Sequence, residues 1–391
     1  MLYYLFDWLD GLDVPGAGMF RYISFRAAFS AITSLCIMLL FGKRFIRFIK
    51  RKQIGETVRQ LGLEGQNEKA GTPTMGGLLI LAAIIIPTLL FAQLDNIYVL
   101  IMLGTTVWLG LVGFIDDYIK VFKKDKQGLP GKFKVIGQVS LGLVVGLLVC
   151  FHPDINPHST LTTIPFVKGN ELDYAYIITW MGDWAKDWVW LLYVIIVILV
   201  VTAVSNASNL TDGIDGLATG VASVNGGALA ILAWLSGNVI MANYLNIMYL
   251  PNIGELTVFI SAFVGATLGF LWFNSHPAEI FMGDTGSLAI GGIIAVFALL
   301  IRKELLLPVL CGIYLVEDLS VILQTMSCKI YRRNHKLPMS QQVPVEHRAF
   351  LMTPLHHHYQ KKGIKEQKIT MRFIIVAVLL AIVSIVTLKM R

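Results

Sequence analysis

Charged residues are scarce in this sequence. Asp, Glu, Lys and Arg together make up 15% of its 391 residues, whereas hydrophobic residues make up 55%. Soluble domains contain about 25% charged residues. Disordered chains contain fewer apolar residues than folded domains do. The shortage of charge therefore excludes intrinsic disorder, a collagen-like fibre and an ordinary soluble globule.

Cysteine and the common nucleotide-binding motifs are also scarce or missing. The sequence has no C-x-x-C pair, so neither a zinc site nor a disulfide framework is suggested, and buried, inert thiols are favoured. It has no Walker A sequence, dinucleotide fingerprint or H-E-x-x-H, so the use of ATP or NAD is not indicated. The four cysteines are Cys36, Cys150, Cys311 and Cys328.

Apolar blocks of about twenty residues are abundant, and this is the length of a helix that crosses a bilayer. We therefore predict an all-α, polytopic membrane protein with about ten transmembrane helices, in a single integral-membrane domain over residues 1–391. The candidate spans lie near residues 22–41, 75–94, 97–115, 134–151, 189–205, 216–236, 256–273, 286–301, 305–328 and 371–388.

Basic residues are concentrated in alternate connections between these spans. Residues 42–74, 116–134 and 329–372 contain eight, six and ten of the 32 Lys and Arg residues. Cytoplasmic connections are enriched in Lys and Arg, so ten spans place both termini outside. This distribution accounts for the net charge of +7 without a nucleic-acid partner, and no cleavable signal peptide is found. The predicted cytoplasmic segments lie near 42–74, 116–134, 206–215, 274–285 and 329–370.

The longest predicted external connection, 152–188, ends in the sequence WMGDWAKDWVW. Trp180, Trp184 and Trp188 are four residues apart, so a helix would place them on one face. This favours an interfacial helix in the aromatic belt of the membrane. A Trp-rich loop without regular structure is the alternative.

Polar side chains interrupt the apolar pattern at four places, all at predicted cytoplasmic ends. Membrane proteins keep carboxylates out of hydrocarbon unless those groups serve a function. The four groups are Asp116 and Asp117, then Asn206, Asn209, Asp212 and Asp215, then Asp284, and last His356, His357 and His358.

The chemistry of these groups points to a metal and to phosphates. The repulsion between Asp116 and Asp117 is commonly offset by a divalent cation or a shared proton, although a solvated helix end is the alternative. The three histidines are either a metal tract or a phosphate-contacting or acid/base cluster. Carboxylates surrounded by lysines suit Mg²⁺ and an anionic substrate. The residues therefore predict a Mg²⁺-dependent enzyme that acts on phosphates at the inner face of a bilayer.

Two further acids, Glu317 and Asp318, fall in the middle of the ninth predicted span. Acids inside a membrane span are functional candidates by default. Because this span is long and could break there, stabilisation of a kink is the alternative.

Six sequence boxes together resemble the phospho-N-acetylmuramoyl-pentapeptide transferase family. They are KAGTPTMGG (from Lys69), GFIDDYIKV, NASNLTDGIDGL, FLWFN, FMGDTGSLA and PLHHHY. The resemblance implies transfer of phospho-MurNAc-pentapeptide from UDP-MurNAc-pentapeptide to undecaprenyl phosphate, giving lipid I and UMP. It implies Mg²⁺ as cofactor, the bacterial cytoplasmic membrane as location, and a homodimer as one possible assembly. That reaction is the first membrane step of peptidoglycan synthesis.

The same resemblance implies roles for residues at matching positions. Asp284 is implied as the Mg²⁺ ligand, and Asp116 as the base that deprotonates the lipid phosphate. Asp117 is implied as a further catalytic residue, and His356 as a phosphate contact or catalytic partner near Asp284. Phe281 is implied to stack on uracil. Substrate binding is implied for Lys69, Asn206, Asn209, Asp212, Gly213, Asp215, Asn274, Phe281 and His357.

The sequence departs from the family pattern in four places. Gln360 stands where the resemblance predicts Glu, and Ile214 where Leu is usual. The segments 332–354 and 152–188 are longer than expected, and we expect them to affect partners or loop order rather than chemistry. Direct attack of the lipid phosphate, without an aspartyl-phosphate intermediate, is favoured because it meets the requirement for in-line geometry in fewer steps.

Three other functions were weighed against this one. A sister enzyme that transfers phospho-GlcNAc to the same lipid, for teichoic acid or O-antigen, would share the Asp pair and the Asp-rich loop. A secondary transporter has similar spans, but its acids belong at the membrane midplane and no internal repeat is found here. A non-catalytic scaffold would not need this many carboxylates.

Overall fold

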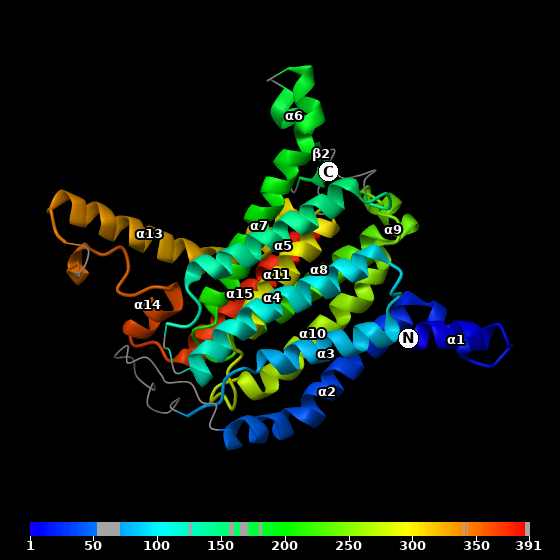
Figure 1. The fold of residues 1–391 in the computed structure, drawn as a ribbon, viewed down its shortest axis with the longest axis horizontal. Helices are drawn as coiled ribbons and strands as arrows, with labels where there is room; N and C mark the ends of the chain where they lie inside the picture. Colours follow the sequence, from blue (N-terminus) through cyan, green and yellow to red (C-terminus); the bar gives the residue numbers. More distant parts are fainter. Residues whose placement is uncertain are drawn as a thin grey trace.

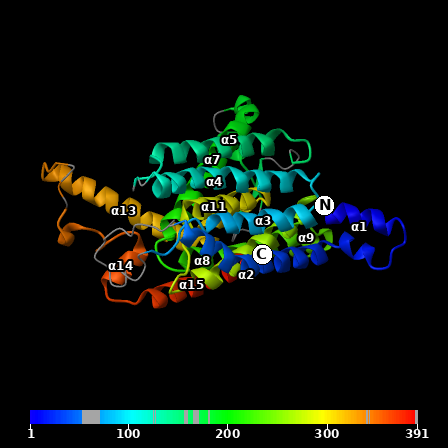
Figure 2. The ribbon, with the colours of Figure 1, turned by 60° about the horizontal axis from the view of Figure 1, so that its bottom comes forward.

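The computed structural model contains a bundle of helices that run side by side (Figures 1 and 2). It describes residues 1–52, 71–123, 125, 127–155, 160–164, 171–179, 182–338, 341 and 343–387. The helices are α1 (Leu2–Asp10), α2 (Ile23–Arg51), α3 (Gly77–Phe91), α4 (Ile97–Phe122), α5 (Gly131–Phe151), α6 (Ala175–Ile178), α7 (Val189–Thr211), α8 (Leu217–Ser236), α9 (Val239–Leu245), α10 (Leu256–Asn274), α11 (Gly283–Leu300), α12 (Leu307–Leu310), α13 (Gly312–Asn334), α14 (Leu355–Lys361) and α15 (Glu366–Val386). Two short strands, β1 (Leu161–Thr163) and β2 (Glu171–Asp173), pair antiparallel.

Eight helices among the described residues are long and apolar enough to cross a membrane: α2, α4, α5, α7, α8, α10, α11 and α15. The two other predicted spans contain the 15-residue helix α3, which includes Pro87, and the bent pair α12–α13. The predicted all-α membrane fold is therefore confirmed. The count of ten is not, because the described residues give eight spans, or nine if the bent pair is one span.

Helix α11 lies at the centre of the bundle and packs against α3, α4, α7 and α8. All of its residues after Asp284 are buried, as expected for a helix that is apolar on every side. Glycines bring its first turn close to its neighbours. A Cβ on Gly77 of α3 would lie 2.2 Å from the amide N of Gly286, and a Cβ on Gly113 of α4 would lie 2.2 Å from the carbonyl O of Asp284. These contacts fix the start of α11 between α3 and α4.

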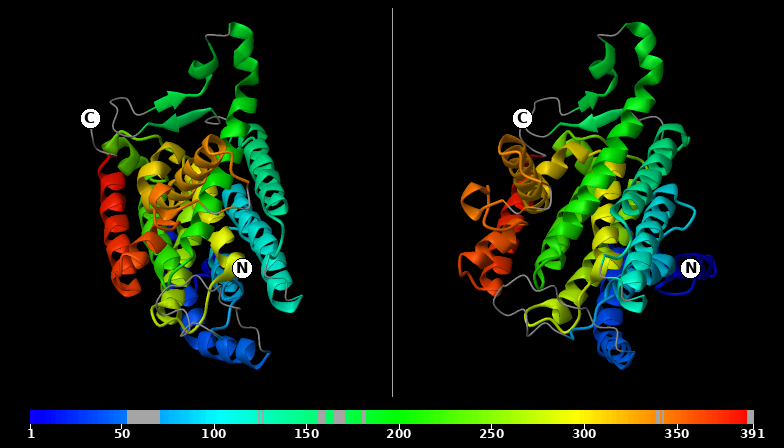
Figure 3. Two further views of the ribbon diagram at one scale, coloured as in Figure 1. Left: turned by 90° about the vertical axis from the view of Figure 1, so that its left-hand side faces the viewer. Right: turned by 60° about the vertical axis from the view of Figure 1, so that its left-hand side comes forward.

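The ninth predicted span, 305–328, is a bent pair of helices, so the break that we considered for this span is present, but at Cys311 rather than at Glu317 and Asp318. Helices α12 and α13 meet at Cys311 with a bend of 80°, and α13 projects away from the bundle (Figures 1 and 3). At the bend Gly312 leaves room for Leu380 of α15, whose Cδ1 would lie 2.7 Å from an added Cβ. The break precedes Glu317 by more than a helical turn, so the kink-stabilising role considered for the acids at 317 and 318 is wrong.

A buried polar cluster closes the end of the bundle at which the strands lie (Figure 3). The Lys303 ammonium donates to Thr163 Oγ1 at 2.7 Å, and the Tyr174 hydroxyl donates to Glu304 Oε1 at 2.9 Å. The backbone N–H of Thr163 donates to the carbonyl of Arg302 at 3.2 Å. We call Thr163, Tyr174, Arg302, Lys303 and Glu304 the hairpin-end cluster.

Both ends of the described chain lie toward this hairpin end. The N-terminal ammonium of Met1 donates to the carbonyl of Leu89 at 2.7 Å, near the C-terminal end of α3. Helix α15 starts beside Asp215 at the opposite end and runs toward the strands. This agrees with the expectation that both termini share one side, whereas the choice of the outer side stays a prediction.

The expected helix carrying three tryptophans on one face is not seen. Residues Asp183–Trp188 form a short 3-10 helix in which Trp184 and Trp188 are exposed, and Trp180 lies outside the described residues. A 3-10 helix has three residues per turn, so residues four apart point in directions about 120° apart. Trp184 and Trp188 therefore do not share one face.

The four cysteines are free, as expected, but they are not all buried. Cys150 and Cys311 are buried, Cys328 is half-buried and Cys36 is exposed. Cys36 lies on α2, a helix whose outer face is not covered by its neighbours, so the expectation of a buried thiol was wrong there.

Candidate active site

Asp116 and Asp117 lie near the end of α4 and are 0% and 3% exposed. Gly113, one turn earlier, lets α4 approach the first residues of α11 so closely that no side chain fits between them. The two aspartates are therefore held against the start of α11. This burial rules out the alternative of a solvated helix end.

Asp117 caps helix α11 from the neighbouring helix. Its Oδ1 accepts from the backbone N–H of Asp284 at 3.0 Å, and its Oδ2 accepts from the backbone N–H and the hydroxyl of Thr285 at 2.9 and 2.5 Å. The first N–H groups of a helix have no partner within the helix, and Met282, the residue before α11, supplies no side-chain cap. Gly283, which lies directly before Asp284, has φ +72°, a conformation that glycine adopts readily. Asp117 therefore fixes the backbone from which Asp284 projects.

The side chains of Asp116, Asp117 and Asp284 converge at one point. One carboxylate oxygen from each lies within 4.8 Å of the others. Lys120 Nζ lies 2.5 Å from Asp116 Oδ2 and 3.2 Å from Asp284 Oδ2. Lys134 Nζ lies 3.0 Å from Asp116 Oδ1 and also contacts Asp284. We call these three carboxylates and two lysines the acidic site.

The acidic site could hold a divalent metal ion. Three carboxylates and two ammonium groups leave one excess negative charge when all are ionised, and Asp284 keeps 14% of its side chain exposed. Mg²⁺ is typically held by one or two carboxylates together with phosphate oxygens of the substrate. Asp117 accepts three hydrogen bonds from the start of α11, and Asp116 Oδ1 accepts from the backbone N–H of Leu129 at 2.7 Å, which leaves Asp284 as the carboxylate most open to an ion.

Lys120, Lys134 and Thr285 were not among the predicted site residues. Lys120 follows Asp116 by four residues on one helix, a spacing that brings opposite charges together and could have identified it. Lys134 comes from the start of α5, so its approach depends on the packing of two helices and leaves no sequence signal. Thr285 follows Asp284 directly, but its partner Asp117 is 168 positions away.

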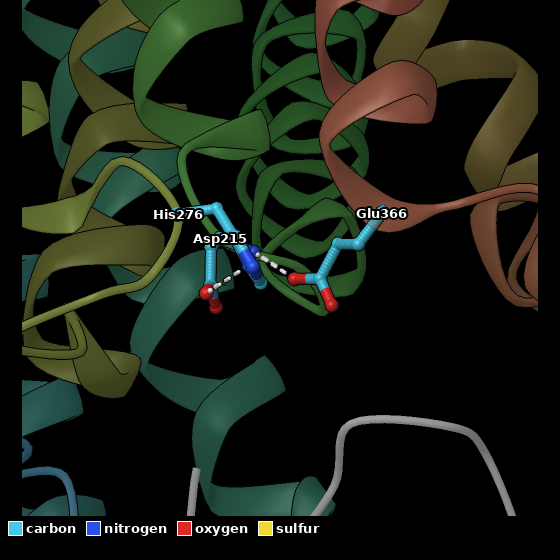
Figure 4. Close-up of side chains that lie close together, drawn as sticks. All are labelled: Asp215, His276 and Glu366. Atoms are coloured by element: carbon cyan, nitrogen blue, oxygen red, sulfur yellow. Dashed lines mark hydrogen bonds and ion pairs between the residues drawn. The ribbon is translucent and has the colours of Figure 1, made fainter. Parts of the chain in front are cut away.

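A second group of polar residues surrounds the turn between α7 and α8. Asp215 is buried, and its Oδ2 lies 3.1 Å from His276 Nδ1 and accepts from the backbone N–H of Ala278 at 3.2 Å. The backbone N–H of Asp215 donates to Glu366 Oε1 at 2.7 Å. Figure 4 shows the His276 imidazole between the two carboxylates. These three side chains could hold a cation, but hydrogen bonds already join them into one network.

Asn274 and Thr370 fix the same turn through its backbone. Asn274 Oδ1 accepts from the N–H of Gly216 at 3.2 Å, and its amide donates to the carbonyl of Ile280 at 2.9 Å. The Thr370 hydroxyl donates to the carbonyl of Asp215 at 3.1 Å. Asn274 is only 3% exposed, so in the structure it holds the turn, and its role in substrate binding stays a prediction.

The three histidines lie on the short helix α14 and have different surroundings. His356 is fully buried, with Nδ1 3.2 Å from Glu317 Oε2. His357 Nδ1 lies 2.7 Å from Gln360 Oε1, and His358 Nδ1 accepts from the N–H of Leu351 at 3.1 Å. This divergence removes the alternative of one metal bound by all three. Among the described contacts none joins His356 to Asp284, so the expected partnership stays a prediction.

Asn206 and Asn209, two further predicted substrate-binding residues, lie on α7 and contact neighbouring helices. Asn206 exchanges hydrogen bonds with Gln138 of α5, at 3.0 and 3.1 Å. The Asn209 amide donates to the Ser287 hydroxyl of α11 at 2.8 Å. Asn209 thus joins α7, which leads into the turn, to the helix that begins at the acidic site.

Three more residues were predicted to bind substrate, namely Phe281, Asp212 and Lys69. The half-buried Phe281 lies just before α11, and its carbonyl accepts from the N–H of Gly76 at 2.9 Å. Asp212 directly follows the last residue of α7 and precedes Gly213. Lys69 lies outside the described residues. Their roles in substrate binding stay predictions.

Comparisons with known proteins agree with this arrangement. Residues 99–302 match the family model described as glycosyl transferase family 4, and residues 69–81 match the phospho-N-acetylmuramoyl-pentapeptide-transferase signature 1. The chain is similar to proteins with the name phospho-N-acetylmuramoyl-pentapeptide-transferase from Flavobacterium johnsoniae (55% identity), Parabacteroides distasonis (52%) and Bacteroides thetaiotaomicron (50%). Each of these similarities covers 100% of both chains.

Proposed function

The chain belongs to the phospho-N-acetylmuramoyl-pentapeptide-transferase family, and from that membership we propose its reaction and the residues that perform it. The protein transfers phospho-MurNAc-pentapeptide from UDP-MurNAc-pentapeptide to undecaprenyl phosphate, and the products are lipid I and UMP. It acts as a multi-pass protein of the bacterial cytoplasmic membrane.

One observation supports this proposal most directly, namely the convergence of three buried or nearly buried carboxylates with two lysines at one end of the bundle. The reaction exchanges one pyrophosphate linkage for another, so its energetic balance needs no nucleotide hydrolysis. Its barrier comes from bringing two phosphate anions together. A site with two ammonium groups, and with carboxylates that could hold a cation, lowers that barrier by neutralising charge.

Asp284 would hold Mg²⁺. When bound, the ion would supply positive charge to the phosphates of the donor. Asp117 keeps Asp284 in place, because its two oxygens accept three hydrogen bonds from the first residues of α11. Asp117 therefore acts as a positioning residue in this proposal.

Asp116 takes the proton of the lipid phosphate, and the resulting oxygen attacks the phosphorus that carries MurNAc-pentapeptide. The bond from that phosphorus to the bridging oxygen breaks, and UMP leaves with the bond electrons. Lys120 and Lys134 contact Asp116 and Asp284, so they lie where they can pair with phosphate oxygens as these approach. No covalent bond to Asp116 is needed, and trapping of a phosphorylated Asp116 without lipid phosphate would contradict this direct route.

The nucleotide binds at the turn between α7 and α8, beside Phe281. Support comes from the rigidity of the turn, which Asn274, Thr370 and Glu366 hold through its backbone. A rigid turn orients a bound ligand without the entropic cost of ordering a loop at each binding event. Phe281 would stack on uracil.

The test is release of UMP by the purified full-length chain in detergent, with undecaprenyl phosphate and UDP-MurNAc-pentapeptide. We expect release with Mg²⁺ and none with chelator, and we expect Asp284→Asn to abolish it. Replacement of the donor by UDP-GlcNAc is the matched control. Turnover with UDP-GlcNAc but not with UDP-MurNAc-pentapeptide would refute the proposed substrate, and release that is indifferent to chelator would refute the metal.

A further inference from the structure

His356 and Glu317 form a fully buried pair that the reaction described above does not use. Both side chains are 0% exposed. Glu317 Oε2 lies 3.2 Å from His356 Nδ1, while Glu317 Oε1 accepts from the backbone N–H of His356 at 3.2 Å. One carboxylate therefore contacts both the backbone and the imidazole of the same residue, which fixes the orientation of that ring.

The contact to the backbone also supplies a cap that α14 lacks. Helix α14 begins after Pro354, which has no side chain able to accept a hydrogen bond, and no side chain of its own caps it. The Glu317 carboxylate, from α13, accepts the N–H of the second residue of this helix. Such an acceptor satisfies one of the orphan donors at a helix start. The 80° bend at Cys311 sets the direction in which α13 leaves the bundle and thus where Glu317 lies.

The pair also bears on which nitrogen of the imidazole carries a proton. Glu317 Oε2 approaches Nδ1 to 3.2 Å as a charge contact rather than an aligned hydrogen bond, since among the described residues neither ring nitrogen has a hydrogen-bond partner. A carboxylate at this distance favours an N–H over a lone pair on the nitrogen that faces it, so the contact favours the proton on Nδ1. A Cβ on Gly213 would lie 2.2 Å from Nε2, so this nitrogen lies directly against the turn between α7 and α8.

We propose that Glu317 is a positioning residue of this enzyme, which holds His356 with Nδ1 protonated and Nε2 directed at the nucleotide-binding turn. The inference deepens the proposed function and rests on it for the assignment of the reaction. Glu317 lies 39 positions before His356 in the sequence, on the part of the ninth predicted span that follows the break. Glu317 itself contacts no substrate.

The first experiment compares Glu317→Gln with the wild-type chain in the UMP-release assay. Glutamine has the same shape but no negative charge, so the His356 imidazole loses the carboxylate that favours a proton on Nδ1. We expect kcat to fall by about 10- to 100-fold, with the KM for the donor and the Tm changed by little. Asp318→Asn is the matched control, because Asp318 is adjacent on α13 and no described contact joins it to α14. It should keep wild-type kcat.

A double-mutant cycle separates positioning of His356 from a structural role of Glu317. If Glu317 acts through His356, the variant Glu317→Gln, His356→Asn should be no slower than His356→Asn alone. Losses that multiply in the double variant would overturn the proposal, as would an unchanged kcat in Glu317→Gln. A fall in kcat that is matched by a large loss of Tm would also count against it.

A second measurement needs neither turnover nor the Glu317 variant. In the full-length chain with ¹⁵N-labelled histidine, the signals of His356 are those lost in His356→Asn. We expect them to show a protonated Nδ1, and a bare Nδ1 with the proton on Nε2 would refute the proposal. This readout does not depend on the proposed reaction. If the wild-type chain failed to release UMP from UDP-MurNAc-pentapeptide, the proposed function would be refuted, and the ¹⁵N signals would still test the contact between Glu317 and His356.

Discussion

The two ends of the helix bundle treat buried charge in opposite ways. Toward the hairpin end, beside the last residue of α3, Arg26 and Glu255 form a buried pair of opposite charges. The Arg26 guanidinium donates to both carboxylate oxygens at 2.7 and 2.5 Å and to the carbonyl of Phe91 at 3.1 Å. The two side chains are 1% and 6% exposed. At the other end Asp116, Asp117 and Asp284 face one another, and two partly exposed lysines do not balance them.

The difference distinguishes structural charge from functional charge. In the Arg26–Glu255 pair both carboxylate oxygens accept from the guanidinium, and only Arg26 Nε lacks a partner among the described residues, so the two charges compensate each other without a ligand. Like charges held together cost free energy, and a folded protein keeps them together only when other contacts enforce the arrangement. Here the enforcing contacts are the cap that Asp117 provides and the close approach at Gly113. The comparison therefore predicts that changes at one end reduce activity and changes at the other reduce stability.

The largest effect is expected for Asp284→Asn at the acidic site. We expect the rate of UMP release to fall by about 10³-fold or more, because the amide removes the negative charge that would hold Mg²⁺. The Tm should not fall, since the change also removes repulsion from Asp116 and Asp117. Parallel measurements of UMP release and Tm in detergent provide the check. A loss of Tm as large as that of an Arg26 variant would contradict the division between the two ends.

At the hairpin end, Arg26→Met should reverse this pattern. It leaves the Glu255 carboxylate buried without its partner, which destabilises a protein by about 3–5 kcal/mol. We expect a clear fall in Tm and an unchanged kcat per folded molecule. The double variant Arg26→Met, Glu255→Leu is the matched control, because it removes both charges and should recover much of the Tm. No recovery would mean that the pair acts in some other way.

The close approach of α4 to α11 can be tested with two glycines on one helix. A Cβ on Gly113 would lie 2.2 Å from the carbonyl O of Asp284, whereas a Cβ on Gly104 meets nothing within 4 Å. Gly113→Ala should displace the start of α11, lowering both the Tm and kcat, the latter by about 10-fold or more. Gly104→Ala should leave both unchanged or raise the Tm slightly. Equal effects of the two variants would show that packing against Asp284 is unimportant.

The smallest effect concerns pH at the hairpin end. Burial lowers the pKa of Lys303 to about 8 from its ordinary value of 10.5. The unfolded chain therefore binds more protons than the folded one between these two values, so stability rises with pH through this window. We expect the Tm of the wild-type chain, relative to Lys303→Met, to increase between pH 8 and pH 10, by the equivalent of about 1–2 kcal/mol. A constant difference across this range would contradict the lowered pKa.

The membrane fold and the acidic site were predictable from the sequence because their signals are local. Blocks of apolar residues identify spans without any knowledge of their neighbours, and carboxylates such as Asp116 and Asp284 stand out against them. That α4 and α11 bring these carboxylates together could be expected only from the family resemblance. Distances of 4.8 Å or less between their oxygens follow from glycine contacts that no periodicity reveals.

Other features depended on tertiary packing and were missed. A break in the ninth span was considered at Glu317 and Asp318, but its position at Cys311 was missed, because the packing of Leu380 against Gly312 is what marks it. Lys134 and Glu317 act through partners 150 and 39 positions away, so no window along the chain contains both members of either pair. Hydrophobic pattern thus predicts elements well, whereas the polar contacts between elements need the structure.

The glycine contacts around α11 have a consequence for mutational tolerance. Gly77 and Gly286 touch backbone to backbone, so even the smallest side chain at position 77 would overlap the chain at position 286. In a saturation library selected for growth, position 77 should therefore accept almost no substitutions, although it contacts no substrate in the proposed reaction. Intolerance at position 77 would report the spacing between two helices. Position 104, where an added Cβ meets nothing within 4 Å, should accept substitutions, and this contrast would show that close packing limits position 77.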